Sequence, residues 1–239
     1  MPQIRHKVLN QTISYRILTP LSNGTRPLDM DDAWEAANIV KVTVPQLRGV
    51  DDGTSGGSTG VIRFHKAGAA QLLAAFAEIE QRGLKHLILS FAGSYYPRMI
   101  RGSTSSPSEH SFGTALDINA GWNGLAKTPA PRGAKGSVVE LVPIFEKHGF
   151  RWGGYFSRPD GMHFELARLI ADAVPIAKAR SLSINNGKQI RLIPNARLEN
   201  GYYLAPVREI IDAMNFDFTT DEAHTTPDKF VLNVYKPKG

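Results

Sequence analysis

The chain has 239 residues, of which 42% are hydrophobic and 21% are charged. This composition is typical of a globular protein and excludes a disordered or fibrous chain. Its 28 Lys and Arg against 22 Asp and Glu give a net charge of +6, which favours solubility and, secondarily, attraction to an anionic polymer. No dense basic run is interleaved with aromatic residues, so nucleic acid is not an expected partner.

Cysteine is absent, which excludes disulfides and thiolate metal sites. Any metal must therefore be bound through nitrogen and oxygen atoms. The N-terminal residues contain no apolar stretch of signal-peptide length, and no run of about 18 apolar residues occurs anywhere. The sequence predicts neither a membrane span nor a standard export signal.

The first part of the chain alternates short apolar runs with turn residues. Residues 39–44 form one such run, and residues 51–60 form a loop rich in Gly, Ser and Thr. Residues 66–82 place apolar side chains at helical spacing and are followed by Gly83, which predicts an amphipathic helix. Residues 87–91 then predict a buried strand.

A second helix is predicted from a capping-box spacing of Ser137 and Glu140, with its end near residues 148–149. Pro143 conflicts with a regular helix, so the first turn should be separate or kinked. Residues 150–155 lead into residues 160–165, which are expected to form a loop and then a strand.

A break near residues 178–181 predicts two domains, 1–180 and 181–239, of α+β class. The expected elements of the smaller domain are a hairpin of residues 182–184 and 190–193 around an Asn-Gly turn, a helix over 206–214, and a strand over 230–235.

The residues that suggest chemistry begin in a polar, loop-rich stretch over residues 101–123, where sites tend to lie. His110 and Asp117 are seven positions apart with small residues between them, so the chain can fold back to bring them together. His163 offers a third ligand, and Asp160 precedes it by three residues. Catalytic zinc takes three such ligands, with a free carboxylate nearby as proton acceptor. On spacing alone, ordinary surface histidines are the default interpretation.

Two motifs raise the weight of the metal hypothesis. Residues 108–117 match S-x-H-x-x-G-x-A-x-D, and residues 160–165 match D-x-x-H-F-E. In this order they resemble the zinc D,D-carboxypeptidase and L-alanyl-D-glutamate endopeptidase family, which includes VanY-type enzymes and several phage endolysins. The resemblance extends over residues 61–166. It implies a compact α+β fold with a small antiparallel sheet and flanking helices, like that of D-Ala-D-Ala carboxypeptidases and Hedgehog proteins.

Transferred residue by residue, the resemblance implies that His110, Asp117 and His163 bind Zn²⁺. It assigns the general base to Asp160, where other branches of the family carry Glu, and places Ser108 beside the substrate. The implied activity is cleavage of peptidoglycan peptide stems. The scissile bond stays open between D-Ala-D-Ala and L-Ala-D-Glu.

An arginine before the first motif usually stabilises the oxyanion in this family, often within a G-Y-R-S sequence. Residues 93–101 depart from that pattern and leave Arg98 and Arg101 as rivals, with Arg98 slightly favoured. A planar, permanently charged guanidinium suits either a carboxylate or a developing oxyanion.

Residues 182–235 resemble the copper amine oxidase N-terminal-like domain, which implies either a module that binds the cell wall or a partner, or a passive stabilising one. Two alternatives to catalysis on a metal remain. One is a non-catalytic phage tail or wall-binding protein with a relic peptidase fold. The other is a serine hydrolase through Ser58, since residues 56–60 fit G-x-S-x-G, although a nucleophile elbow requires a preceding strand and a following helix.

The expected place of action is the cell wall, with its peptide stems as substrate and its anionic polymers as a second partner. Without a signal of its own, the chain would stay in the cytoplasm until released, as a phage endolysin does. A bacterial carboxypeptidase is the alternative, and the sequence does not indicate an oligomeric state.

Overall fold

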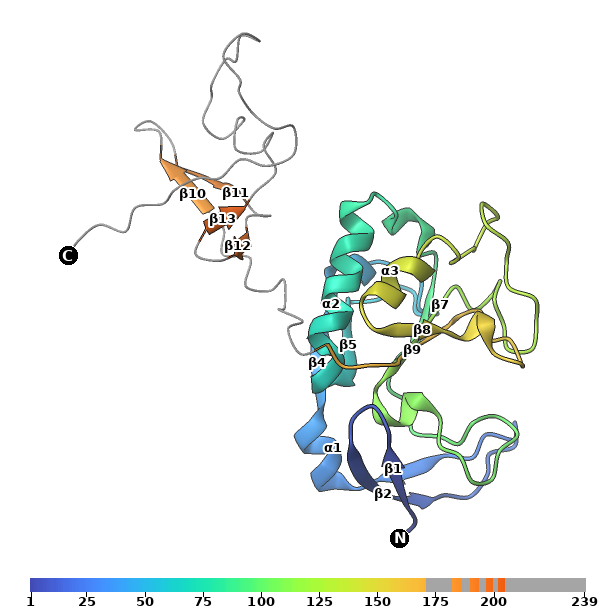
Figure 1. Ribbon diagram of the computed structural model, residues 1–239. Coiled ribbons are helices and arrows are strands. Elements are labelled where there is room, and N and C mark those ends of the chain that lie inside the picture. The colour runs from blue at the N-terminus through green and yellow to red at the C-terminus, as the bar shows by residue number, and fades with distance from the viewer. Residues whose placement is uncertain (171–181, 186–189, 194–196, 200–201, 205–239) are drawn as a thin grey trace, which may run out of the picture. The chain divides into compact units, whose positions relative to one another are not determined.

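The computed structural model describes residues 1–170 and four short strands within residues 182–204 (Figure 1). Backbone contacts divide the chain into two compact units, Met1–Pro175 and Ile176–Gly239. Within the described residues, no helix has the length and apolar character needed to cross a bilayer.

The N-terminal residues form a three-stranded antiparallel sheet. Its strands, in the order β1-β2-β3, are Gln3–His6, Gln11–Ile17 and Leu28–Met30. Ile13 and Tyr15 of β2 are buried while Thr12 and Arg16 are exposed, which is the two-residue period of a half-buried strand.

A helix and a strand pair follow. Helix α1 (Asp32–Asn38) is capped by the Asp31 side chain, which accepts a hydrogen bond of 2.8 Å from the Trp34 backbone N–H. Strand β4 (Ile39–Thr43) pairs antiparallel with β5 (Val61–His65), and α2 (Lys66–Gln81) begins directly after β5. The apolar run at 39–44 contains β4, and the predicted helix at 66–82 is confirmed.

The central sheet carries the candidate site. Its order is β6-β7-β9-β8, with strands Phe91–Gly93, Ala115–Ile118, His163–Leu166 and Phe150–Trp152, all antiparallel. Every residue of β7 and β9 is buried. Polar side chains on these two strands must therefore find partners inside the protein. Mixed helices and small antiparallel sheets agree with the expected α+β class.

Helix α3 (Val142–Lys147) lies beside α2, and the rings of Phe76 and Phe145 meet edge to face at 5.7 Å (Figure 1). Pro143 stands in its first turn, where the lack of an N–H costs nothing. Ser137 and Glu140 contact each other at 3.2 Å in a separate turn before the helix, as the sequence predicted. The remaining short helical turns are η1 (Pro45–Leu47), η2 (Lys85–Leu87), η3 (Glu109–Phe112) and η4 (Gly153–Tyr155).

The predicted strand at residues 87–91 is wrong, because η2 ends at Leu87 and β6 begins only at Phe91. The Asn119 side chain replaces a neighbouring strand here. Its Oδ1 accepts hydrogen bonds from the backbone N–H groups of Leu89 and Ser90, at 2.8 and 3.0 Å. Its Nδ2 donates to the Leu87 carbonyl at 2.8 Å. A side chain thus satisfies the backbone of an apolar run that sequence alone assigns to a sheet.

The loop at residues 51–60 contains no helix or strand, apart from a single bridge from Asp51 to Ser90. The strand β5 follows it, whereas a nucleophile elbow requires a helix. Ser58 is buried, and its Oγ accepts a hydrogen bond of 3.1 Å from the Gly60 backbone N–H. These features give no support to serine hydrolysis.

In the second unit, β10 (Leu182–Asn185) pairs antiparallel with β11 (Ile190–Ile193), which confirms the strand pairing of the predicted hairpin. A second pair, β12 (Arg197–Glu199) with β13 (Tyr202–Leu204), was not predicted. The predicted helix at 206–214 and strand at 230–235 lie outside the described residues, and the domain boundary near residue 180 stays a prediction.

His65 is a buried titratable group at the start of α2. Its Nδ1 accepts a hydrogen bond of 3.1 Å from the Ala67 backbone N–H, so the proton of the neutral ring lies on Nε2. That Nε2 is buried without a hydrogen-bond partner. Burial lowers the pKa of His65 to about 4, and the positive charges of His6 and Lys66 add to the shift.

We expect His65→Asn to flatten the dependence of folding stability on pH between about 6.5 and 4. In the unfolded chain His65 takes up a proton as the pH falls through 6.5, whereas in the folded chain it stays neutral until about pH 4. The contribution of His65 to the free energy of unfolding is therefore present at neutral pH and is lost on acidification. The loss in the free energy of unfolding that His65 causes over this pH range is about 2 kcal/mol, once relaxation around the charged ring is allowed for. The Asn side chain keeps an acceptor for the Ala67 backbone N–H, so the helix cap is preserved.

Denaturant unfolding of both proteins at pH 7 and pH 4.5 measures this difference. Other titrating groups cancel in the comparison, so equal losses of stability in the two proteins would refute the assignment.

Candidate metal centre

Three side chains from separate segments meet at one point between η3 and the central sheet. Asp117 on β7 and His163 on β9 are direct partners in the strand register, and His110 lies on η3. The Asp117 Oδ1 lies 3.0 Å from His163 Nδ1 and 3.2 Å from His110 Nε2, and the two nitrogens are 3.2 Å apart. All three residues are buried. The structure thus brings together the three residues that were predicted from the sequence to be metal ligands.

The dimensions of this triangle fit a metal ion. Ligand atoms at about 2.0–2.1 Å from a tetrahedral zinc lie about 3.3–3.4 Å from one another. The observed separations of 3.0–3.2 Å are close to that value. Nitrogen and carboxylate oxygen are also donors that zinc accepts.

Hydrogen bonds on the far side of each imidazole fix which nitrogen faces the cluster. His110 Nδ1 lies 2.7 Å from the Ser94 carbonyl, which only accepts, so Nδ1 carries the proton. His163 Nε2 likewise donates to Glu165 Oε2 at 2.9 Å. Glu165 is in turn paired with Arg151 on β8. Both remaining nitrogens therefore present lone pairs, as metal-binding histidines do.

Three lone-pair atoms facing one another repel unless a cation or a proton lies among them. Burial alone would raise the pKa of Asp117, but the charge and hydrogen bonds of His110 and His163 outweigh it and hold this pKa well below its ordinary value. Burial would lower the pKa of His163, but Asp117 and Glu165 raise it to about 10. The cluster thus has a high affinity for a positive charge, and a metal ion would displace a proton from it.

Asp160 lies beside the cluster at the start of the second motif. Its carbonyl accepts from the His163 backbone N–H at 3.0 Å, and its own N–H donates to the Gly153 carbonyl at 2.9 Å. Its Oδ1 is buried without a hydrogen-bond partner among the described residues. Burial raises the pKa of Asp160, the charge of Asp117 adds to the shift, and positive neighbours including Arg98 reduce it. Such a carboxyl group is suited to taking up and releasing a proton.

Gly153 allows the close approach that positions Asp160. A Cβ at this residue would lie 2.5 Å from the Asp160 carbonyl oxygen and 3.1 Å from the His163 Cβ. Since the first contact is with backbone, a side chain at Gly153 would displace the segment that holds both site residues.

Ser108 is buried and caps η3, the turn that carries His110. Its Oγ accepts from the His110 backbone N–H at 3.4 Å, and its own backbone N–H donates to the Arg98 carbonyl at 2.9 Å. These contacts support a positioning role for Ser108 in addition to the expected contact with substrate.

The two rival arginines occupy different environments. Arg98 is half-buried, and its backbone N–H and carbonyl both bond to Ser111 Oγ, at 2.8 and 2.7 Å. The positive charge of Arg98 also reduces the rise in the pKa of Asp160. Arg101 is exposed, and its carbonyl accepts from Arg158 Nη1 at 3.0 Å. The electrostatic link to Asp160 favours Arg98 as the residue nearer the chemistry.

Two supporting contacts were not anticipated from the sequence. The Ser94 carbonyl, which orients His110, is a backbone group and leaves no signal in a motif. His6, which lies outside both motifs, donates from Nε2 to Glu109 Oε2 at 2.8 Å and ties the N-terminal hairpin to η3. These two residues are 103 positions apart, beyond the reach of any local pattern.

Comparison with known proteins agrees with the site. Residues 101–166 match the model of a family described as D-alanyl-D-alanine carboxypeptidase. The matched segment is less than a third of the chain and includes all three cluster residues and Asp160, whereas Arg98 lies just before it. No curated protein and no solved structure matches the chain. This segment is therefore similar to a peptidase family, while the C-terminal resemblance lies outside the match and stays a prediction.

Proposed function

We propose that the protein is a zinc-dependent peptidase that cleaves the peptide stems of bacterial peptidoglycan. The observation that carries this proposal is the buried triangle of His110, Asp117 and His163, with ligand atoms 3.0–3.2 Å apart, inside the segment similar to the carboxypeptidase family. The fixed tautomers of both histidines support metal ligation.

In this proposal His110 Nε2, Asp117 Oδ1 and His163 Nδ1 hold the ion. A bound zinc supplies Lewis-acid polarisation of the peptide carbonyl and lowers the pKa of water. Asp160 accepts the proton of the attacking water and returns it to the leaving amine, for which its raised pKa is suited. Arg98 stabilises the negative charge that develops on the carbonyl oxygen.

The family description makes the D-Ala-D-Ala bond the first to assay, and the L-Ala-D-Glu bond the second. Action on peptidoglycan requires the protein to reach the cell wall, as an exported carboxypeptidase or a phage endolysin would. Mass spectrometry of fragments released from defined muropeptides identifies the bond.

Removal of metal is expected to abolish cleavage, and added zinc should restore it. The protein should bind one equivalent of zinc, because the cluster provides one set of three ligands. His110→Ala should lose the metal, whereas His86→Ala, an exposed histidine, should retain both metal and activity. Metal analysis and stem-peptide turnover before and after dialysis against a chelator measure these outcomes. Unchanged turnover after complete metal removal would contradict the proposal, and zinc binding without cleavage of any stem would favour a non-catalytic relic.

A further inference from the structure

The turn η3, which carries the expected ligand His110, is tied to a residue near the start of the chain. His6 ends β1 and is only 5% exposed. Its Nδ1 accepts a hydrogen bond of 3.1 Å from the Leu9 backbone N–H, so the proton of the neutral ring lies on Nε2. This Nε2 donates to Glu109 Oε2 at 2.8 Å. Since Glu109 directly precedes His110, the hydrogen bond holds the turn next to the ligand.

Other contacts hold η3 around this hydrogen bond. The Thr114 hydroxyl donates to the same Glu109 oxygen at 2.6 Å. The ring of Phe112, within η3, packs edge to face on the His6 ring, with centroids 4.8 Å apart. Phe112 also meets Trp34 of α1 edge to face at 6.5 Å. His6 thus contacts η3 both through its proton and through the face or edge of its ring.

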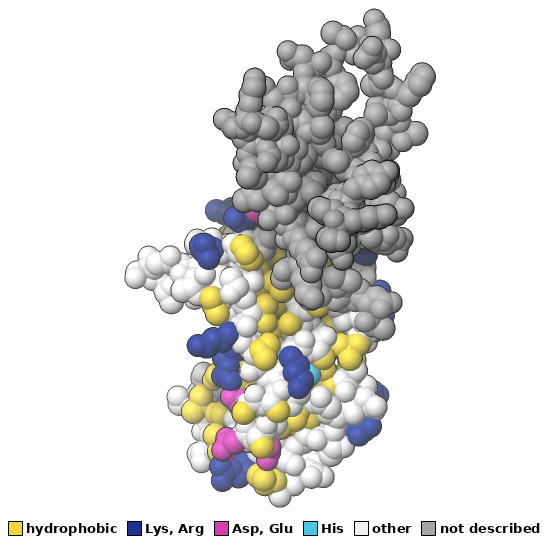
Figure 2. Space-filling model, turned by 90° about the vertical axis from the view of Figure 1, so that its left-hand side faces the viewer, with side chains coloured by type: hydrophobic (Ala, Val, Ile, Leu, Met, Phe, Trp, Pro, Cys, Tyr) yellow, Lys and Arg dark blue, Asp and Glu magenta, His cyan; other side chains and the backbone are white. Residues whose placement is uncertain are grey.

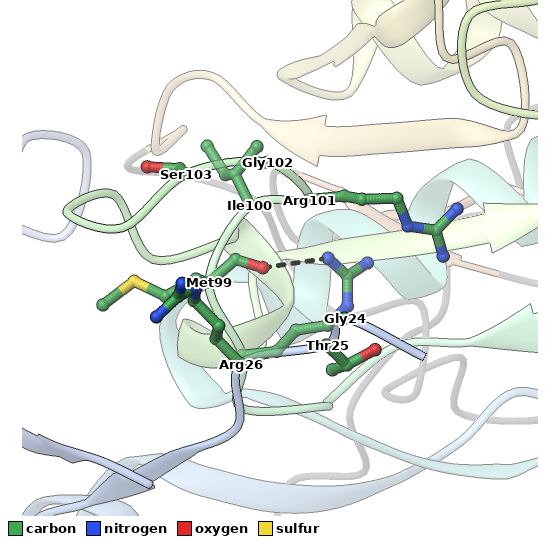
Figure 3. A pocket seen from close by; sticks show the side chains of 9 residues that line it. Gly24, Thr25, Arg26, Met99, Ile100, Arg101, Gly102 and Ser103 are labelled. Carbon is green, nitrogen blue, oxygen red and sulfur yellow. Dashed lines mark hydrogen bonds between the residues drawn. The ribbon is translucent and has the colours of Figure 1, made fainter. Parts of the chain in front are cut away.

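A second connection from the N-terminal residues to η3 passes through one intermediate segment. The Met99 N–H donates to the Arg26 carbonyl at 2.9 Å, and Figure 3 shows these two residues in the lining of one pocket. The neighbouring Arg98 carbonyl accepts from the Ser108 N–H at 2.9 Å, and Ser108 caps η3. Both connections start from residues outside 101–166, the segment similar to the carboxypeptidase family.

The burial of His6 indicates what its ring is holding. A polar group avoids the cost of desolvation by staying at the surface, as the Lys and Arg side chains do among hydrophobic and uncharged ones on the face drawn in Figure 2. A buried polar group must instead find partners inside the protein. One nitrogen of His6 is paired within its own hairpin and the other with η3, so the second hydrogen bond joins the N-terminal sheet to the metal centre.

We propose that His6 is a positioning residue, which fixes η3 through Glu109 and thereby raises the affinity of the cluster for a metal ion. This inference rests on the metal site of the proposed function and extends that site to the N-terminal sheet. A loose turn would have to become ordered when the ion binds, and the cost of ordering would weaken binding. Because His6 orders the turn in advance, loss of its hydrogen bond should weaken metal binding without removing a ligand.

Two substitutions at His6 separate its two hydrogen bonds. Asn retains an acceptor for the Leu9 N–H but is too short to reach Glu109, whereas Gln places an amide donor near the position of Nε2. His6→Asn is expected to weaken zinc binding by about tenfold, and His6→Gln should retain most of the affinity. Competition with a chromophoric chelator measures the Kd for zinc, and denaturant unfolding of the metal-free protein measures stability.

His148→Asn is the matched control. His148 Nε2 lies 2.7 Å from Glu78 Oε2, so this variant breaks a part-buried His–Glu contact of the same kind at the end of α3. It should lower the free energy of unfolding and leave the Kd for zinc unchanged. Equal Kd values for His6→Asn and the unaltered protein would overturn the proposal. An equal loss of affinity in His148→Asn would also overturn it, since general destabilisation would then explain both results.

Hydrogen exchange of the metal-free protein separates this inference from the proposed function. Within η3, the Ser111 N–H is protected by a hydrogen bond of 2.8 Å to the Ser108 carbonyl. This amide should exchange about tenfold faster in His6→Asn but not in His148→Asn. If the protein bound no zinc, the proposed function would fail, and faster exchange would still show that His6 holds η3. Unchanged exchange in His6→Asn would overturn the inference whether or not zinc binds.

Discussion

Asp160→Asn is expected to lower kcat for stem-peptide cleavage by about a thousandfold while the zinc content stays unchanged. The side chain of Asn has nearly the same shape but cannot accept a proton from water. Asp160 lies outside the triangle of ligand atoms, so its charge is not needed to hold the ion. Steady-state kinetics and metal analysis on the same preparation measure both quantities.

The control for this experiment is Asp52→Asn, which removes a carboxylate from the exposed loop at residues 51–60 and should leave kcat unchanged. Loss of zinc from Asp160→Asn would show that Asp160 is a ligand. Retention of full activity would show that another group moves the proton.

Glu165→Gln is expected to weaken zinc binding by about tenfold to a hundredfold. Glu165 accepts the Nε2 proton of His163 and is itself paired with Arg151, so its negative charge makes His163 a stronger donor. Gln preserves the size and one acceptor oxygen but removes the charge. Competition with a chromophoric chelator measures the affinity.

Glu146→Gln provides the matched control for Glu165→Gln, because Glu146 lies on α3 and its side chain makes no hydrogen bond in the described structure. If Glu165→Gln and the unaltered protein bound zinc equally, the hydrogen bond to His163 would have no role in tuning the metal site.

The expected ligands could be identified from the sequence because they lie in two short motifs. His110 and Asp117 are close in sequence, and His163 follows in a motif of its own, so their residue types and order could be identified. The Ser94 carbonyl and the contact of His6 with Glu109 could not be predicted, because each joins segments whose proximity only the fold establishes.

The prediction of secondary structure failed where a side chain replaced a strand. Residues 87–91 have the apolar character of a strand, but Asn119 satisfies their backbone groups, and no local pattern reveals a partner some 30 positions away. The helix of α2 was predicted well because its start, its apolar face and its end are all local features.

The direct pairing of Asp117 with His163 has a consequence for the whole domain. The two residues stand opposite each other on β7 and β9, 46 positions apart, so a slip of one residue would point one of them to the other side of the sheet. An ion held by both strands and by η3 would therefore act as a cross-link, in a chain that has no cysteine to form one. Resistance to unfolding should then rise with the concentration of free zinc.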